Sequence, residues 1–384
     1  MLNAIFTLDY EIHGNGEGSP EKLMIEPTRR MLDQFARHGA KLTIMADVAE
    51  ILKFKEFKET TGRDAFHYEA IADQLRETIR RGHDVQLHLH ASYFNSRYAD
   101  GRWAQDWSEY NFAGLPYERL NEIVRIGKNY LEQLLQPVNR NYRCVAFRAA
   151  NWAVSPSQNV VRALTANGIR IESSVFKHGR REGMVSFDYS NAHSHLAPWP
   201  ADENDICRRD SQSRLTEVPI YCERRWLGAF LTLNRIYRAG QTSKHSISKA
   251  SGPAKGPPHA TGKTNRLLSR LKLPFRRHAW KADFNQCSGR QLIRAIERAE
   301  ADFGAEAETL PFVLIGHSKI YTRLNEWSLD PFLSFVANNP SRLGFGTLSD
   351  CLGRVRSRGF KAKPMLAAAP VTAMQAGVLN RGAN

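Results

Sequence analysis

Residues 83–90 read His-Asp-Val-Gln-Leu-His-Leu-His, an alternating stretch that is typical of a β-strand. The alternation places His88 and His90 on one face of the strand and the apolar residues on the other. Two imidazoles at a strand end can bind one metal ion, and a hydrogen-bonded pair of half-buried histidines has the same pattern. This stretch alone leaves both interpretations open.

Strand-like and helix-like segments alternate along the rest of the chain. The predicted strands cover residues 3–9, 41–46, 83–90, 142–148, 169–175, 215–221 and 311–316, and the predicted helices cover residues 26–38, 68–81, 117–135, 157–167, 290–302 and 329–338. This order indicates an α/β fold with a parallel sheet or barrel.

The composition sets the broad class of the protein. The chain has 384 residues, of which 42% are hydrophobic, enough for one large core. The sequence has no apolar run long enough to span a bilayer and no pattern of a secretory leader, so we expect a cytoplasmic protein. Its five scattered cysteines form neither a metal-binding spacing nor a disulfide framework.

The net charge of +15 is concentrated in two segments. Residues 240–281 contain ten lysines and arginines and no acidic residue, and residues 354–384 contain six and none. We therefore expect a domain over residues 1–353, interrupted by a basic low-complexity and amphipathic insertion at 240–281 and followed by a disordered basic tail at 354–384.

The basic insertion at 240–281 has two interpretations. It is either a solvated loop or a segment that docks onto an anionic membrane surface, which would make the protein peripheral at the inner membrane face. No nucleic-acid partner is expected, because no known reading module accompanies the charge.

Polar residues follow four of the predicted strands, at the point where each strand ends. They are Asp9, Tyr10 and Glu11 after the first strand, His88 and His90 after the third, Arg148, Asn151 and Trp152 after the strand from residue 142, and His317 after the strand from residue 311. The carboxyl ends of parallel barrel strands share one face, where active sites are built. A structural ion pair would explain Asp9 and Arg148, but four such groups are hard to explain as core filling.

These residue types suit metal-assisted hydrolysis. Two imidazoles and one carboxylate can hold a catalytic metal ion and leave positions open for water and substrate. A second carboxylate can take a proton from that water, and a histidine on the far side can protonate the leaving group. An arginine beside the base keeps it oriented and ionised.

The motifs resemble the polysaccharide deacetylase superfamily, which has the NodB-homology domain of carbohydrate esterase family 4. Thr7-Leu8-Asp9-Tyr10-Glu11 is similar to the Asp-x-Glu variant of the first family motif, and Gly82–Leu87 matches part of the lead to the second. Arg148–Trp152 corresponds to the Arg-x-Pro-Tyr motif, and Leu314-Ile315-Gly316-His317 matches Leu-x-x-His. The resemblance covers roughly residues 3–350 without the insertion, and implies a distorted barrel of about seven β/α units.

The resemblance also implies roles for individual residues. Asp9 would be the catalytic base, Arg148 would steer it, and His317 would be the general acid, while Glu11 and His88 would bind a divalent metal, with zinc the expected ion. The family's second histidine position is Ser92 here, so His90 is predicted as the third ligand from alternation alone. The acid-supporting aspartate is not evident, and Glu172 is a weak candidate.

The expected function is removal of an N-acetyl group from a sugar in cell-surface polysaccharide or lipid-linked glycan metabolism. Tyr10, Asn151 and Trp152, which lie within the same motifs, are predicted to contact this substrate. Two alternatives stay open. The first is a related amide hydrolase, a deformylase or a cyclic-amide hydrolase, which would use the same residues. The second is a non-catalytic carbohydrate-binding protein on a degenerate barrel, which the serine at position 92 favours.

Overall fold

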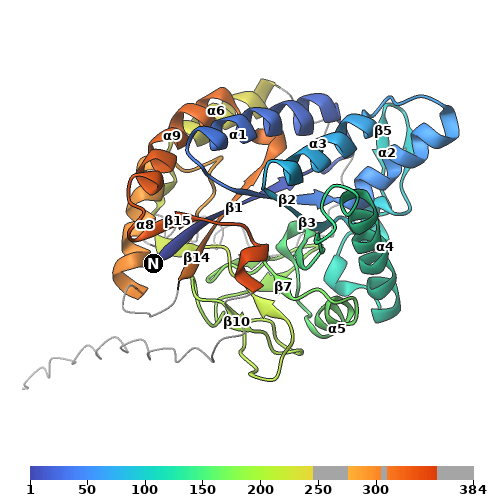
Figure 1. The fold of residues 1–384 in the computed structure, drawn as a ribbon. Coiled ribbons are helices and arrows are strands. Elements are labelled where there is room, and N and C mark those ends of the chain that lie inside the picture. The colour runs from blue at the N-terminus through green and yellow to red at the C-terminus, as the bar shows by residue number, and fades with distance from the viewer. Residues whose placement is uncertain (245–275, 304–308, 353–384) are drawn as a thin grey trace, which may run out of the picture.

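The computed structural model describes residues 1–244, 276–303 and 309–352, and its centre is one curled β-sheet (Figure 1). Across this sheet the strands are β10 (Trp199–Pro200), β11 (Thr216–Glu217), β7 (Ile171–Glu172), β6 (Ala146–Ala149), β3 (Asp84–Leu89), β2 (Leu42–Asp47), β1 (Leu2–Tyr10) and β14 (Leu310–His317), and β15 (Leu343–Phe345) also pairs with β1. All neighbours in this sheet are parallel except β10 and β11.

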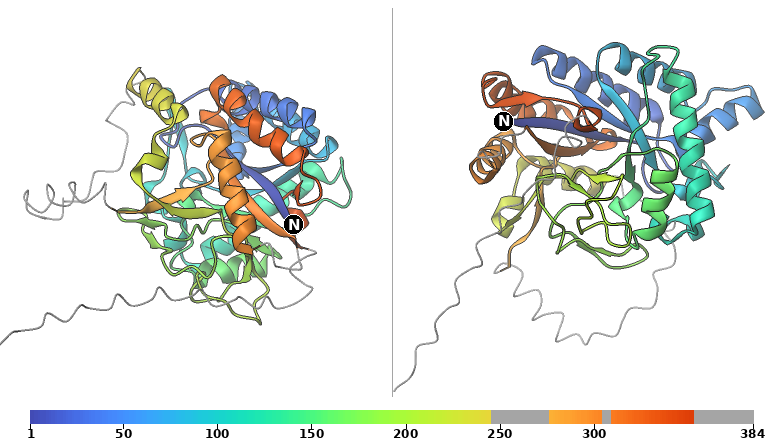
Figure 2. Two further views of the ribbon diagram at one scale, coloured as in Figure 1. Left: turned by 90° about the vertical axis from the view of Figure 1, so that its left-hand side faces the viewer. Right: turned by 60° about the horizontal axis from the view of Figure 1, so that its bottom comes forward.

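Helices lie around the outside of the curled sheet (Figures 1 and 2). They are α1 (Glu26–Arg37), α2 (Val48–Thr61), α3 (Tyr68–Arg80), α4 (Tyr117–Leu135), α5 (Gln158–Ala166), α6 (Leu233–Lys244), α8 (Gly289–Phe303) and α9 (Arg323–Ala337). Three two-stranded antiparallel sheets accompany the main sheet: β4 (Arg97–Ala99) with β5 (Arg102–Ala104), β8 (Arg180–Arg181) with β9 (Phe187–Asp188), and β12 (Cys222–Arg225) with β13 (His278–Lys281).

The sheet comes close to closing on itself. Beyond the named strands, Ile220 bridges to Val313 on β14, and Asp283 bridges to Ile315 on the same strand. Because Ile220 follows β11, these bridges connect the two ends of the sheet. The predicted α/β fold with a distorted β/α barrel is therefore confirmed by the topology.

The central strands have the composition of parallel strands that are covered on both faces. All nine residues of β1 are buried, and so are all six of β2 and of β3. Parallel strands need such continuous burial because helices or barrel interior cover each side. Helix α1 buries Met31, Leu32 and Phe35 against this sheet, and it has a proline in its first turn as predicted.

Several predicted boundaries differ from the structure. The strands predicted at 169–175 and 215–221 have only two residues each in regular pairing, and helix α9 begins six residues before the predicted start at Leu329. The earlier start has a local cause, since Thr322 and Asn325 form a reciprocal capping box at the helix N-terminus. Helix α2 was not predicted from the sequence.

The predicted insertion at 240–281 has wrong boundaries. Its last four residues form strand β13, in which Trp280 is buried, and its first residues belong to helix α6. Residues 245–275, and the predicted tail at 354–384, lie outside the described residues. In the part of the chain that is described, no helix has the length and apolarity needed to cross a membrane.

Candidate active site

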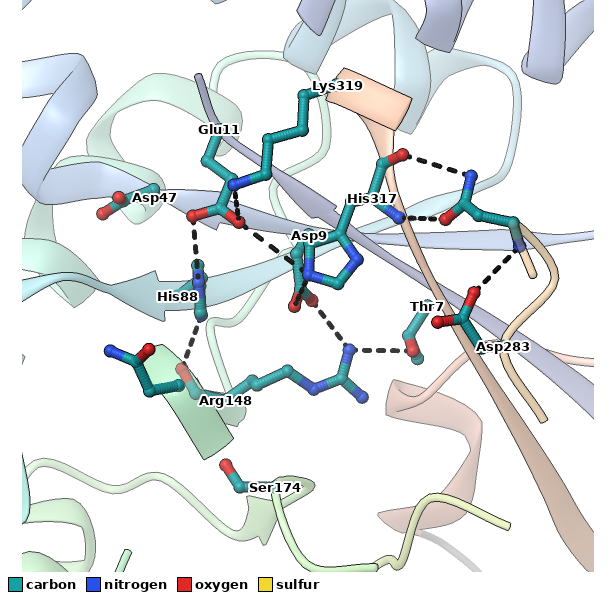
Figure 3. Close-up of polar contacts among 12 residues, drawn as sticks. Thr7, Asp9, Glu11, Asp47, His88, Arg148, Ser174, Asp283, His317 and Lys319 are labelled. Atoms are coloured by element: carbon teal, nitrogen blue, oxygen red, sulfur yellow. Dashed lines mark hydrogen bonds and ion pairs between the residues drawn. The ribbon is translucent and has the colours of Figure 1, made fainter. Parts of the chain in front are cut away.

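The register of the parallel sheet brings the four predicted groups together. Asp9 on β1 is level with His317 on β14, and His88 on β3 is level with Arg148 on β6. All these strands end at the same edge of the sheet, so their terminal side chains converge there, as Figure 3 shows. The predicted convergence of catalytic and metal-binding candidates at one edge is what the structure displays.

Asp9 and Arg148 form a buried ion pair at the centre of this site (Figure 3). Arg148 Nη1 donates to Asp9 Oδ1 at 2.9 Å and to Thr7 Oγ1 at 2.9 Å, and its Nε donates to the carbonyl oxygen of Ser173 at 2.8 Å. The Arg148 side chain is fully buried and that of Asp9 is 3% exposed. The guanidinium therefore has a fixed position and holds one carboxylate oxygen of Asp9.

The other oxygen of Asp9 is directed toward His317. The Nε2 atom of His317 lies 3.5 Å from Asp9 Oδ2. Burial raises the pKa of Asp9, but the positive charge of Arg148, helped by His317, outweighs burial, so the pKa lies below its usual value. Asp9 is thus an ionised carboxylate with one oxygen anchored and one oxygen available for proton transfer.

Glu11, His88 and His90 form a group with the spacing of a metal site. One candidate ligand atom from each residue lies within 4.8 Å of those of the other two. Glu11 Oε2 lies 3.2 Å from His90 Nδ1 and 3.8 Å from His88 Nε2, while Glu11 Oε1 accepts a hydrogen bond from Lys319 Nζ at 2.7 Å. One oxygen of Glu11 therefore faces the two imidazoles and the other is held by an ammonium group.

The two histidines are held differently: His88 is held from behind, whereas His90 presents one ring nitrogen to both Glu11 and Asp47. His88 Nδ1 lies 2.9 Å from the carbonyl oxygen of Arg148, which leaves His88 Nε2 on the side of Glu11. His90 Nδ1 lies 2.8 Å from Asp47 Oδ2, and the His90 backbone N–H donates to the other oxygen of Asp47. A carbonyl partner on the far nitrogen, as His88 has, orients the histidine ligands of metal sites.

The electrostatics of the group favour a bound cation. Burial lowers the pKa of His88, but Glu11 and Asp9 outweigh burial and raise it to about 9. The pKa of Glu11 is well below its usual value, because Lys319 and the two histidines outweigh the effect of burial. A carboxylate and two imidazoles at this spacing match the donor set of a divalent ion such as zinc, so these residues fit a metal.

Metal retention tests this group directly. Loss of a residue that only hydrogen-bonds a metal ligand costs about 10–100-fold in metal affinity. Because His88 and His90 are predicted to bind the metal themselves, we expect His88→Ala and His90→Ala each to cost more than this. The measurement is metal content after dialysis against defined free-metal buffers. His83→Ala is the matched control, because His83 immediately precedes β3, at the end of the strand opposite the site, and its ring accepts a hydrogen bond from the N–H of Leu42. Equal metal retention in all four proteins would contradict the assignment.

His317 is held by a loop that the sequence analysis did not identify. Asn285 Oδ1 accepts from the His317 backbone N–H at 2.6 Å, Asn285 Nδ2 donates to the His317 carbonyl, and Asp283 Oδ1 accepts from the Asn285 N–H. Burial lowers the pKa of His317, and the nearby charge of Lys319 lowers it further, against the opposing effect of Asp9. His317 Nδ1 is buried and has no hydrogen-bond partner among the described residues.

Glu172 does not support His317, which corrects the weak prediction made for it. Its carboxylate accepts hydrogen bonds from the backbone N–H and the hydroxyl of Ser174. Ser174 also accepts from the N–H of Ala149, next to Arg148. Glu172 therefore belongs to the packing behind Arg148, and Asp283 is connected to His317 through Asn285.

Trp152 and Asn151 lie at the site as predicted, and both have positive φ angles. The ring of Trp152 meets the ring of His317 edge to face, with centroids 6.0 Å apart. Asn151 Oδ1 accepts from Arg181 Nη1 at 3.0 Å and from the Tyr110 hydroxyl at 3.3 Å. Their positions keep both residues as candidates for substrate contact.

Tyr10 lies on the other side of the strand, which corrects its predicted role. Its side chain is fully buried, and its hydroxyl donates to Gln74 on helix α3 at 2.7 Å. Alternation along β1 explains this, because Asp9 and Glu11 share one face and Tyr10 has the opposite one. Ser92 is likewise absent from the metal group, since its hydroxyl donates to Gln105.

Lys281 is a further residue of the site that sequence reasoning missed. Its ammonium group lies 3.3 Å from the ring centroid of Trp152 and 4.4 Å from that of Phe176. Burial lowers the pKa of Lys281 to about 8, with Asp283 partly opposing it. Position 281 is within a lysine-rich stretch of the sequence, so only its pairing in β13 distinguishes it from solvated neighbours.

The pH dependence of Lys281 reactivity checks this environment. Because burial disfavours the charged form, we expect the free amine to become populated near pH 8, well below the usual lysine range. The measurement is competitive acetylation with peptide mapping by mass spectrometry from pH 6 to pH 11. Lys55, whose pKa is raised by Glu59, is the internal control. A Lys281 that reacts only in parallel with Lys55 would contradict the buried cation–aromatic contact.

Comparisons with known proteins show distant structural likeness only. No protein-family model matches the chain, and no curated protein matches it in sequence. A 4-alpha-glucanotransferase from Thermococcus litoralis has 14% identity and a TM-score of 0.49 over 92% of this chain, which spans 40% of that enzyme's length. A protein assigned as a polysaccharide deacetylase from Mycobacterium smegmatis has 13% identity and a TM-score of 0.47, covering 96% of this chain and 94% of that one.

Another similar structure is a family 4 carbohydrate esterase from Streptomyces lividans, solved with acetate. It has 8% identity and a TM-score of 0.37, and the match covers 91% of this chain and 95% of the esterase. The similar structures thus include polysaccharide deacetylases and other carbohydrate-active enzymes. At these identities and scores they assign no function to this chain, and its membership of the deacetylase superfamily stays a prediction from its motifs.

Proposed function

We propose that this protein is a metal-dependent hydrolase that removes the N-acetyl group of an amino sugar, within cell-surface polysaccharide or lipid-linked glycan metabolism. The observation that carries the proposal is the arrangement of three functions at one sheet edge. Asp9 is an anchored carboxylate, Glu11 with the two histidines forms a metal-type group, and His317 lies across from them. The sugar substrate is inferred from the motif resemblance described above.

Asp9 supplies the base of the reaction. Its Oδ2 atom is free of the arginine and accepts a proton from the attacking water, while the oxygen of that water bonds to the acyl carbon. Arg148 holds Oδ1 and keeps the carboxylate ionised, so the base needs no reorientation during the step. The proton on Asp9 then lies within reach of His317 Nε2, 3.5 Å from Oδ2.

His317 supplies the acid. The carbon–nitrogen bond breaks with its electron pair on nitrogen, and His317 Nε2 donates a proton to the departing amine, so that one water gives one acetate and one free amino sugar. A lowered pKa suits this role, because a weakly basic imidazole gives up its proton readily once it has received one. Asn285 and Trp152 fix the backbone and the ring face of this histidine.

Glu11, His88 and His90 would hold the divalent ion. When bound there, the ion supplies Lewis acidity that lowers the pKa of water and offsets negative charge on the acyl oxygen. Lys319 holds the second oxygen of Glu11 through its ammonium group, so that the carboxylate presents Oε2 toward the histidines.

Acetate release from a panel of N-acetylated sugars tests the proposal. The panel contains free and nucleotide-linked N-acetylhexosamines and short N-acetylated oligosaccharides, each beside its N-formyl analogue, and a cyclic amide. We expect acetate from at least one N-acetyl sugar, and its loss in His317→Ala. If the protein releases only formate, or opens only the cyclic amide, its activity is the related amide hydrolysis and the deacetylase proposal is wrong. No product from any compound by the metal-loaded protein would contradict an enzymatic role.

A further inference from the structure

Exposed large apolar side chains are concentrated in one region of the molecule. Ten such side chains are exposed among the described residues, and seven of them come from the segment after β12, helix α6 and helix α9. We call these seven residues the α6 surface: Trp226, Leu227, Leu231, Leu233, Ile236, Tyr237 and Trp327. Leu231 is 77% exposed and Trp327 is 72% exposed. A cluster of this kind usually marks an interaction site.

Helix α6 faces solvent with its apolar side. Leu233, Ile236 and Tyr237 have the spacing of one helix face and are all exposed. Asn234, between them in sequence, is buried and donates to the carbonyl oxygen of Cys287 at 3.0 Å and to the Ser328 hydroxyl at 3.2 Å. The hydrogen bonds of Asn234 fix this orientation, so the outward apolar face is part of the fold.

Four of the seven residues line two adjoining hollows. One, of about 480 Å³, is lined by Leu231, Leu233 and Trp327 together with Arg290. The other, of about 550 Å³, contains Trp226. Both hollows share Gln291, whose side chain donates to the carbonyl of Ala229. The α6 surface is therefore continuous between α6, α9 and the β12–β13 sheet, at the edge of the molecule where α6 stands in Figure 2.

Arginines form the rim of this surface. The hollow beside Trp226 is lined by Arg224, Arg225, Arg277, Arg294 and Arg298, and no carboxylate lines either hollow in the described residues. Glu223 pairs with Arg225 and Arg298. Arg224, Arg277 and Arg294 form no ion pair within the described part of the chain, and Arg277 lies over the Trp226 ring at 5.3 Å.

We propose that the α6 surface docks the protein peripherally onto an anionic lipid membrane. The apolar side chains enter the boundary between headgroups and acyl chains, the tryptophans and Tyr237 lie at headgroup level, and the rim arginines bind lipid phosphates. This proposal does not depend on the catalytic proposal.

The charge of the rim selects this occupant over a second copy of the chain. A symmetric dimer through the α6 surface would place arginines opposite arginines, and such like-charge juxtaposition opposes association. An anionic leaflet instead complements a rim of one sign. The adjoining sequence has the same sign, since residues 240–281 contain ten basic residues and no acidic one.

The β12–β13 sheet lies between the docking surface and the candidate active site. Trp280 lines the arginine-rich hollow, and Lys281, the next residue, contacts Trp152 at the site. Side chains of neighbouring strand residues point to opposite faces of the sheet. Trp280 is therefore directed toward the hollow and Lys281 toward the candidate active site. Strand β13 therefore borders the α6 surface with one residue and the candidate active site with the next.

Vesicle co-sedimentation of the full-length protein tests the proposal. The vesicles are pure phosphatidylcholine, or phosphatidylcholine with 30% phosphatidylglycerol, at about 0.1 M and about 1 M salt, where screening differs strongly. We expect binding to the anionic vesicles only, reduced at high salt. The triple variant Leu231→Ser, Leu233→Ser, Ile236→Ser and the double variant Arg277→Gln, Arg294→Gln should each lower the bound fraction at least fivefold.

Matched controls separate this surface from the basic sequence beside it. Met184→Ser removes an exposed apolar side chain elsewhere, and Arg125→Gln removes an exposed arginine on α4; both should bind as the parent protein does. Parent-level binding by the triple and double variants would overturn the proposal, since the membrane contact would then lie elsewhere. Absence of binding by the parent, or a dimer in sedimentation velocity that only the triple variant converts to monomer, would overturn it as well.

Discussion

Replacing Asp9 by asparagine is expected to lower kcat for acetate release by about 10²–10⁴-fold, the range over which a positioned general base acts. The amide has the shape of the carboxylate but cannot accept the proton through Oδ2, the oxygen that faces His317. The measurement is initial-rate kinetics on the best substrate of the panel, with the metal content of each protein determined beforehand.

The control for this variant is another buried aspartate, at the opposite end of the sheet. Asp84 begins β3 and accepts hydrogen bonds from Gln86 and Ser349, far from the carboxyl ends of the strands. Asp84→Asn is expected to keep kcat within about twofold, whatever it does to stability. An Asp9→Asn protein that binds metal and keeps parent-level activity would exclude Asp9 as the base.

Replacing Arg148 by methionine is expected to cost about 3–5 kcal/mol of folding free energy. The methionine fills part of the volume but leaves the Asp9 carboxylate, which is 3% exposed, without its partner. It also leaves Thr7 Oγ1 and the carbonyl of Ser173 without the donor that they have now. The measurement is equilibrium urea unfolding followed by circular dichroism.

A more exposed ion pair provides the comparison for this stability effect. Arg119 pairs with Glu109 and Glu122 and is 23% exposed, so Arg119→Met is expected to cost about 0–1 kcal/mol. If the two arginine variants lose similar stability, removing Arg148 does not leave a buried, uncompensated charge on Asp9. If Arg148→Met is also fully active, the orientation of the base does not depend on it.

Site residues could be predicted from the sequence when two signals agreed: a side chain suited to catalysis or metal binding, and a position at the end of a predicted strand. Asp9, Glu11, His88, Arg148 and His317 each follow a clear apolar strand, and parallel strands end at one edge. The same alternation rule also places Tyr10 on the opposite face of β1, so the error in its role came from following the motif and not the strand.

The rest of the site depends on contacts that no local pattern shows. Lys281, Asp283 and Asn285 follow a long basic stretch and reach His317 and Trp152 only because β13 pairs with β12 and Asp283 bridges to β14. Asp47 is a similar case, because it ends β2 without a motif and becomes relevant through its contact with His90. Non-local pairing of short segments decides these positions, and periodicity in a single sequence does not report it.

The boundary of the basic insertion is a second case in which the sequence alone does not report the pairing of a short segment. Composition correctly marks residues 240–281 as rich in positive charge, but composition cannot separate Arg277, on the rim of the α6 surface, from Lys281, which is against Trp152. Four strand residues within a lysine- and proline-rich stretch give too short a pattern for recognition.

Acetate release before and after metal removal tests the central claim most directly. The purified protein is assayed as isolated, after chelation and dialysis, and after Zn²⁺ is restored, on an N-acetylated sugar that the parent protein hydrolyses. The claim predicts that chelation abolishes acetate release, that restored Zn²⁺ recovers it, and that recovery fails in His88→Ala. Undiminished release by the metal-free protein would contradict a metal-dependent hydrolase built on Glu11, His88 and His90.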